Sequence, residues 1–292
     1  MATLREIRRR ISSVKNTQKI TKAMKMVAAA KMRRAQDAII SARPYAKKIK
    51  EILSQLSSFE NSTNSLFEKR NIEKIAIVIV AADRGLCGAF NSNIVRSVSQ
   101  RIEKEYSELY KSKKVFLYCV GKKSFDFFSK RNYEIAGKYI GIFNSLKFGD
   151  AQEISTELID GFLNKKFDKV EIIYNEFKSV ISQKTNIEQF LPIISLENNV
   201  QNSNDSYIYE PKKEEILKTL IPKHLNFQIW KILLESNASE QASRMTAMEN
   251  ATTNARDLIS SLQLTYNKAR QAAITKELLE IVGGAEALSQ SN

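Results

Sequence analysis

Residues that break helices are scarce in this chain, which has only nine Gly and four Pro among its 292 residues. Together with a charged fraction of 27%, this scarcity argues against collagen-like, low-complexity and disordered proteins and favours a helix-rich globular protein. Cysteine and histidine are rarer still. Cys87, Cys119 and His224 do not form a spaced metal or redox motif, so we expect no metal, no cofactor and two reduced thiols.

Long apolar runs are also lacking. The longest, Ile75–Ala82, has eight residues, whereas a helix needs about 20 to cross a bilayer. Arg5, Glu6 and the basic run at residues 8–10 interrupt the start of the chain, where a signal peptide would need an apolar core. We therefore expect neither an integral membrane protein nor a secretory leader.

Acidic residues are nearly absent from the first 50 positions, which hold 15 basic and 2 acidic side chains. The other 242 residues hold 31 basic and 30 acidic side chains, so almost all of the formal net charge of +14 belongs to one segment. Such a segment fits a nucleic acid or an anionic membrane, or else an acidic protein surface. Because residues 1–44 contain no aromatic side chain that could stack on bases, we predict an acidic protein partner and no nucleic acid.

A seven-residue apolar repeat runs through this basic segment without a slip. Its positions alternate spacings of three and four residues, and 13 of the 16 are apolar. Such a repeat predicts a coiled-coil helix over residues 1–58. Pro44 lies inside it, and the sequence leaves open whether the helix is kinked there. The seam positions are Leu4, Ile7, Ile11, Val14, Gln18, Thr21, Lys25, Ala28, Met32, Ala35, Ile39, Ala42, Ala46, Ile49, Leu53 and Leu56.

A second helical stretch, residues 211–287, ends the chain. Its seam comprises Met248, Thr252, Ala255, Ile259, Leu262, Tyr266, Ala269 and Ala273. We predict that the two terminal helices form an antiparallel coiled coil with each other, and that Gly283 and Gly284 stop the second helix. The alternative is that each helix pairs with another protein or with a second copy.

Residues 70–195 follow a different rhythm, in which short β-branched runs alternate with amphipathic stretches. This alternation predicts an inserted, mainly parallel α/β domain of the Rossmann-like type. Residues 196–210, rich in Asn and Ser, predict a connector back to the last helix. The expected strands are Ile75–Ala81, Val115–Val120, Tyr133–Ile140, Val170–Tyr174 and Ser179–Phe190. The expected helices are Asn93–Tyr106, Lys122–Lys130 and a third that Asp150 caps and that runs to about Leu163.

The turn at residues 82–90 follows the first predicted strand, where a doubly wound fold would hold a phosphate. Gly85 and Gly88 lack the third glycine of the dinucleotide fingerprint, and Asp83 would repel a phosphate. We therefore expect a structural turn, a buried thiol at Cys87 and no catalytic residue. A nucleotide-dependent enzyme and a free-standing basic coiled coil that binds nucleic acid or membrane are the alternatives.

Three segments in this order resemble the gamma subunits of the F-type ATP synthases. They are Ile11–Lys31 (ISSVKNTQKITKAMKMVAAAK), Asp83–Gly88 (DRGLCG) and Ile274–Ala287 (ITKELLEIVGGAEA). The turn departs from the commoner family pattern, with Ala82 in place of a serine and Ala89 in place of a glycine. The resemblance covers the whole chain, and the mature-like start favours a bacterial origin.

The resemblance implies a non-catalytic rotor shaft that couples proton flow to ATP synthesis from ADP and phosphate. One copy would thread a hexamer of alternating alpha and beta subunits and contact the epsilon subunit and the c-subunit ring. It would be a peripheral protein on the cytoplasmic face of the bacterial inner membrane. The resemblance points to Met24, Lys25, Arg270, Gln271, Thr275, Glu277 and Glu280 as coupling residues, and to Arg8, Lys19 and Lys22 as contacts with acidic beta-subunit loops.

Overall fold

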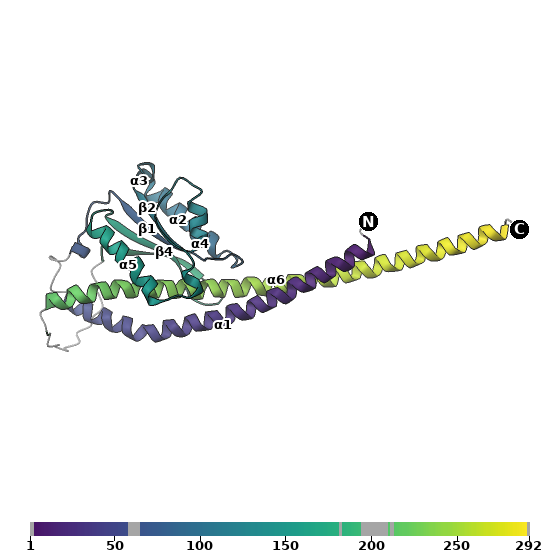
Figure 1. Ribbon diagram of the computed structural model, residues 1–292, viewed down its shortest axis with the longest axis horizontal. Coiled ribbons are helices and arrows are strands. Elements are labelled where there is room, and N and C mark those ends of the chain that lie inside the picture. The colour runs from purple at the N-terminus through teal and green to yellow at the C-terminus, as the bar shows by residue number, and fades with distance from the viewer. Residues whose placement is uncertain (1–2, 58–64, 181–182, 194–209, 211–212, 291–292) are drawn as a thin grey trace. The chain divides into compact units, whose positions relative to one another are not determined.

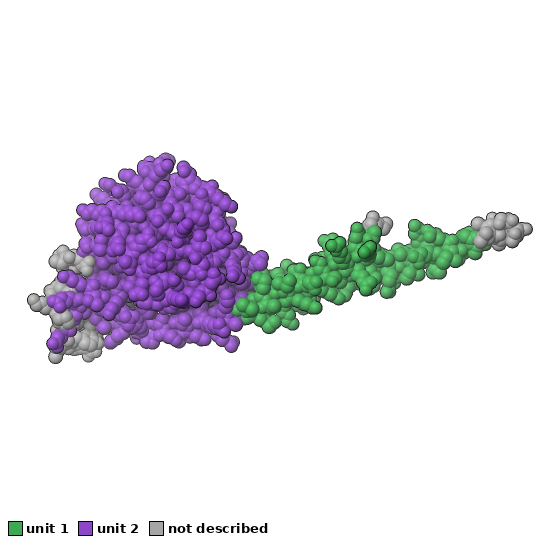
Figure 2. Space-filling model, viewed as in Figure 1, with its two compact units in different colours: residues 1–27, 245–292 green, residues 28–244 purple. Residues whose placement is uncertain are grey.

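A computed structural model describes residues 3–57, 65–180, 183–193, 210 and 213–290. Its two longest helices are α1, Leu4–Ser57, and α6, Lys213–Gln290 (Figure 1). The chain divides into two compact units (Figure 2). Unit 1 pairs residues 1–27 with residues 245–292, and unit 2 comprises residues 28–244. Apart from Glu210, the predicted connector lies outside the described residues.

A reciprocal pair of hydrogen bonds starts α1. The Thr3 backbone N–H donates to Glu6 Oε2 at 2.9 Å, and the Glu6 backbone N–H donates to Thr3 Oγ1 at 3.3 Å. This capping box satisfies amides that the first turn of a helix leaves without partners. Pro44 lies within α1 and does not end it.

The predicted seams coincide with the sides that the two long helices bury. All 15 seam positions of α1 from Leu4 to Leu53 are buried or half-buried, whereas the residues between them are mostly exposed. The eight seam positions of α6 from Met248 to Ala273 are buried or half-buried too. In unit 2, Ala35 and Ile39 of α1 share a cluster with Leu234 and Ala238 of α6. The prediction that the terminal helices pack against each other is confirmed.

The sheet of unit 2 has five strands in the order β3-β2-β1-β4-β5. All neighbouring pairs are parallel except β4 and β5, which are antiparallel. This confirms a mainly parallel α/β domain. The strands are β1, Ile75–Val80; β2, Val115–Val120; β3, Glu134–Tyr139; β4, Lys169–Phe177; and β5, Gln183–Leu191.

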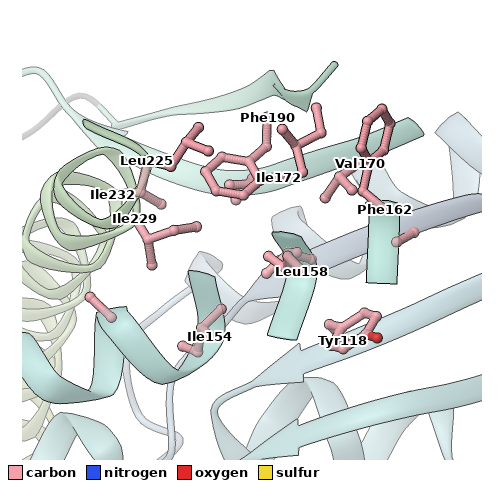
Figure 3. Packing of buried hydrophobic residues seen from close by; sticks show 14 of the residues in the cluster. Tyr118, Ile154, Leu158, Phe162, Val170, Ile172, Phe190, Leu225, Ile229 and Ile232 are labelled. Atoms are coloured by element: carbon pink, nitrogen blue, oxygen red, sulfur yellow. The ribbon is translucent and has the colours of Figure 1, made fainter. Parts of the chain in front are cut away.

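Helices cover both faces of this sheet. Alternate side chains of a strand point to opposite faces, so a central strand such as β1 contributes to two hydrophobic clusters. Ile75, Ile77 and Ile79 of β1 join one cluster with α2, and Ala76, Val78 and Val80 join another with α5 and α6. In the second cluster, Leu225, Ile229 and Ile232 of α6 lie near Phe190 and Ile172 of the sheet and Ile154 of α5 (Figure 3). The remaining helices are α2, Phe90–Glu105; α3, Ser107–Lys111; α4, Lys122–Phe128; and α5, Phe148–Leu163. Short 3-10 turns lie at Ser65–Phe67 and Ile142–Asn144.

Two local predictions are wrong. Asp150 does not occupy the N-cap of α5; Lys147 does, and Asp150 Oδ2 accepts the Lys147 backbone N–H at 2.8 Å from the third helical position. An acidic side chain at the third helical position accepts a hydrogen bond from the backbone N–H of the N-cap residue. Sequence spacing alone does not distinguish this position from the N-cap itself. Gly283 and Gly284 do not stop α6, which continues to Gln290. Glycine costs a helix about 1 kcal/mol but ends it only where the backbone turns left-handed.

Candidate functional site

A polar hollow lies between the two helices of unit 1. Its volume is about 420 Å³. The coiled-coil seam is polar here, since Gln18, Thr21 and Lys25 occupy seam positions where apolar residues prevail elsewhere. The lining residues are Gln18, Lys19, Lys22 and Lys25 of α1 and Glu249, Thr252 and Arg256 of α6.

Polar contacts join the helices beside this hollow. Lys25 Nζ forms an ion pair with a Glu249 carboxylate oxygen. The hydroxyl oxygens of Thr21 and Thr252 are 2.8 Å apart, and Thr21 is only 8% exposed. Both pairs bridge more than 200 positions of sequence, so they fix the register of α1 against α6 in unit 1.

Uncompensated positive charge surrounds the hollow. Within the described part of the chain, no carboxylate lies within ion-pair distance of Lys19, Lys22 or Arg256. The α1 segment from Leu4 to Val27 carries eight basic side chains and one acidic one. Cations at this density repel one another unless an anionic surface approaches them. The geometry therefore offers an acidic partner a cationic patch on paired helices.

The structure gathers only some of the predicted site residues. Lys19, Lys22 and Lys25 line the hollow together, whereas Arg8 is exposed nearer the start of α1 and Met24 is half-buried outside the lining. Sequence analysis missed Glu249 and Arg256, because their approach to α1 depends on the register of the helix pair.

The other predicted residues lie on exposed positions of α6: Arg270, Gln271, Thr275, Glu277 and Glu280. Thr275 Oγ1 donates to the Gln271 carbonyl at 3.0 Å, and Glu280 pairs with Lys276 at 3.5 Å. Both are contacts within α6 between exposed residues.

An exposed apolar surface accompanies these residues, and sequence analysis missed it. Leu279 and Ile281 are each 68% exposed, Val282 is 59% exposed and Leu278 is 57% exposed. Exposed apolar clusters of this kind mark interaction surfaces. The signal was present in the sequence, because the predicted seam of α6 ends at Ala273 while apolar residues continue after it.

A model of the ATP synthase family matches residues 3–288. The chain is 52% identical to the ATP synthase gamma chain of Chloroherpeton thalassium over 100% of both chains. It is 50% identical to that of Chlorobium phaeobacteroides over 99% of each. The chain belongs to the ATP synthase gamma chain family. It is therefore a central-stalk subunit of the ATP synthase, an enzyme complex.

Solved structures agree with this assignment. A chain of the Tetrahymena thermophila mitochondrial ATP synthase, from a structure of its central stalk and c-ring, is 30% identical with a TM-score of 0.61. The match covers 80% of the present chain and 99% of that chain. A chain of the Euglena gracilis mitochondrial ATP synthase has the same fold, with a TM-score of 0.71 at 24% identity and coverage of 98% and 94%.

The glycine-containing turn of this gamma-family chain is built around a carboxylate. Asp83 accepts three backbone N–H groups, from Lys122 and Gly141 at 2.9 Å and from Phe143 at 3.3 Å. These amides belong to the start of α4 and to the 3-10 turn at Ile142–Asn144, so Asp83 ties the glycine-containing turn to two neighbouring segments. This arrangement supports a structural turn.

The same turn is tied to α6. Arg244 donates to the Gly85 carbonyl and pairs with Glu240. Burial raises the pKa of Glu240 even though Arg244 opposes the shift. Cys87 is buried as predicted, and burial raises the pKa of its thiol. Among the described residues, no group of three His, Cys, Asp or Glu side chains is placed to hold a metal, and no helix could span a membrane.

Proposed function

We propose that the unit 1 helices transmit rotation to a catalytic hexamer of alternating alpha and beta subunits, and that this chain contributes no catalytic residue itself. Proton flow through the membrane sector would thereby drive ATP synthesis from ADP and phosphate. The observation that carries the proposal is the cationic hollow, where Lys19, Lys22 and Arg256 have no acidic partner among the described residues. Acidic loops of the beta subunits are the complementary surface.

The proposal requires only that the shaft contacts the conformations of the catalytic subunits with different strength. One shaft inside a ring presents a different side to each catalytic subunit, and a conformation that receives the better contact becomes more populated. A population shift from 1:99 to 99:1 requires about 5.5 kcal/mol of differential binding. Several charge-assisted contacts of roughly 1.5–3 kcal/mol each are enough.

The exposed residues of α6 form a second part of this proposal. Met24 and Lys25 of α1 and Arg270, Gln271, Thr275, Glu277 and Glu280 of α6 are assigned to the coupling segments. Arg8 is assigned to the acidic beta-subunit loops with Lys19 and Lys22. The apolar side chains of Leu279 and Ile281 would then slide against an apolar inner surface of the surrounding hexamer. Apolar side chains form no directional hydrogen bonds that rotation would have to break.

The remaining partners follow from the family. We assign the shaft to residues 1–58 and 211–287, the protruding α/β domain to residues 70–195 and the connector to residues 196–210. One copy would contact the epsilon subunit and the c-subunit ring, peripheral to the cytoplasmic face of a bacterial inner membrane. The similar Tetrahymena chain, which comes from a central stalk and c-ring structure, supports the ring contact.

The test is charge reversal in the assembled complex. Lys22→Glu with Lys25→Glu should lower the number of protons pumped per ATP hydrolysed. Because Lys25 pairs with Glu249, this variant also places two carboxylates together. A triple variant that adds Glu249→Lys restores an ion pair in reverse while Lys22 stays reversed, and it should remain impaired.

A matched control reverses two exposed charges of unit 2, Lys104→Glu with Lys111→Glu, and should pump as the wild type does. An unchanged ratio in both the double and the triple variant would overturn the proposal. Recovery in the triple variant alone would show that helix pairing matters and that the cationic surface does not.

A further inference from the structure

A second, larger hollow lies within unit 2, again between α1 and α6. Its volume is about 770 Å³, within the range of roughly 300–1,000 Å³ that small-molecule sites occupy. It is separate from the coupling segments proposed above. The lining residues are Ile39, Ala42, Arg43, Pro44, Ala46 and Lys47 of α1 and Phe227, Lys231, Leu234 and Glu235 of α6.

Small side chains on the seam create this hollow. Ala42 and Ala46 occupy consecutive seam positions of α1, and neither fills the space that a leucine or isoleucine would occupy. Phe227 also lines the hollow, and its ring centroid lies 5.2 Å from that of Tyr45. The walls are therefore mostly apolar, so an alkyl chain inside the hollow would contact carbon atoms on most sides.

The mouth of the hollow carries an excess of positive charge. Lys231 and Glu235 form an ion pair at 3.7 Å and offset each other. Lys47 is 81% exposed and forms a long ion pair with Glu51, at 3.9 Å, which partly offsets its charge, whereas no described carboxylate pairs with Arg43. The lining thus holds three cations and one carboxylate, with Arg43 and Lys47 together on one turn of α1.

We propose that this hollow binds an amphipathic monoanion of the fatty-acid class. The hydrocarbon chain would lie among Ile39, Leu234 and Phe227, and the carboxylate would lie between Arg43 and Lys47. Both halves of such a molecule match the lining. Burial of its methylene groups against the apolar walls is favourable, and the two cations on one helix turn can form charge-assisted hydrogen bonds with a single carboxylate. A neutral alcohol would lose the second contact, and a cationic amphiphile would be repelled.

Trp230 supplies a built-in probe. It is the one tryptophan of the chain, and it packs against the cluster that contains Ile39 and Leu234, both of which line the hollow. Titration of the full-length chain with sodium laurate, below the concentration at which laurate forms micelles, should change Trp230 fluorescence saturably with one site per chain. Decanoate, two methylenes shorter, should bind on the order of tenfold more weakly.

Two variants locate the site. Arg43→Gln with Lys47→Gln should weaken laurate binding about tenfold, and Ala46→Phe should abolish it by filling the hollow. Lys223→Glu is the matched control, because it reverses an exposed charge on α6 outside the lining and should bind as the wild type does. The double Gln variant changes only surface charge, so its folding is secure even if Ala46→Phe unfolds.

Three outcomes would overturn the proposal: no saturable site for laurate, equal binding of dodecyltrimethylammonium, or equal weakening by Lys223→Glu. Saturable laurate binding that the double Gln variant weakens and Lys223→Glu leaves unchanged would support it.

Discussion

The side chains of Thr21 and Thr252 meet across the helix pair, with their hydroxyl oxygens 2.8 Å apart. Thr252 Oγ1 also lies 2.7 Å from the Met248 carbonyl, and Thr21 Oγ1 lies 3.1 Å from the Gln18 carbonyl. Each hydroxyl has one proton to donate. The shorter distances indicate that Thr252 donates to Met248 and that Thr21 donates to Thr252.

Thr21→Val should therefore loosen the helix pair while nearly preserving its packing, because valine matches threonine in shape. The loss of one hydrogen bond at a position only 8% exposed should cost about 1 kcal/mol. Amide hydrogen exchange of residues 14–27 should become about fivefold faster. Thr17→Val removes a hydroxyl that bonds only to the Ser13 carbonyl of its own helix, so it should leave the exchange nearly unchanged.

The buried carboxylate of Glu171 anchors β4 to α2 through Arg101. Arg101 donates to both Glu171 oxygens, at 2.7 and 3.0 Å, and Lys169 and Tyr106 each contact Glu171 Oε1 at 2.8 Å. Arg101→Met removes two of these contacts and leaves a 2% exposed carboxylate, which should cost about 3 kcal/mol in urea unfolding. Arg96→Met, exposed on the same helix, should cost less than about 0.5 kcal/mol.

Low pH should reduce the difference in unfolding free energy between Arg101→Met and the wild type. Burial alone would raise the pKa of Glu171, but hydrogen bonds from Arg101, Lys169 and Tyr106 outweigh it and lower the pKa. A lowered native pKa stabilises the fold above the ordinary value of 4.5 and loses that stabilisation as the pH falls through the native pKa. A gap between Arg101→Met and the wild type that stays constant to pH 2 would contradict this account.

The contribution of Glu235 to stability should depend on pH in the opposite direction to that of Glu171. Burial raises its pKa, Lys231 opposes the shift, and Glu176 and Glu188 reinforce it. A raised native pKa favours the folded state at low pH and disfavours it as the pH rises from 4.5 through the native pKa. Glu235→Gln should therefore gain stability relative to the wild type as the pH rises above 4.5. Glu215→Gln, exposed on the same helix, should show no such trend in thermal unfolding.

Truncation after Leu278 should leave the folded core intact. The residues from Leu279 to Ala285 are all exposed, so their loss removes no buried contact. The midpoint of thermal unfolding should stay within about 1 °C of the wild type, since exposed positions contribute within about ±0.5 kcal/mol. A fall of several degrees would mean that these residues support the helix pair.

Local pattern was enough for most of the fold. The unbroken alternation of three and four from Leu4 to Leu53 selected the buried side of α1, because side-chain direction repeats with the helix turn. The β-branched run at residues 75–81 similarly predicted a strand, and the structure places it as β1, Ile75–Val80, at the centre of the sheet. The errors at Asp150 and Gly283 concern single residues at helix ends, where caps of different geometry share the same residue types.

The sequence by itself determined the two seams, the location of the positive charge and the alternation that makes a mainly parallel sheet. Only the tertiary structure decided that Asp83 gathers amides from Lys122, Gly141 and Phe143, that Glu249 faces Lys25, and that a hollow opens beside Ala42 and Ala46. The physical reason is range. Periodicity acts over a few residues, whereas these contacts depend on how distant segments align, and that alignment is set by the packing of the whole chain.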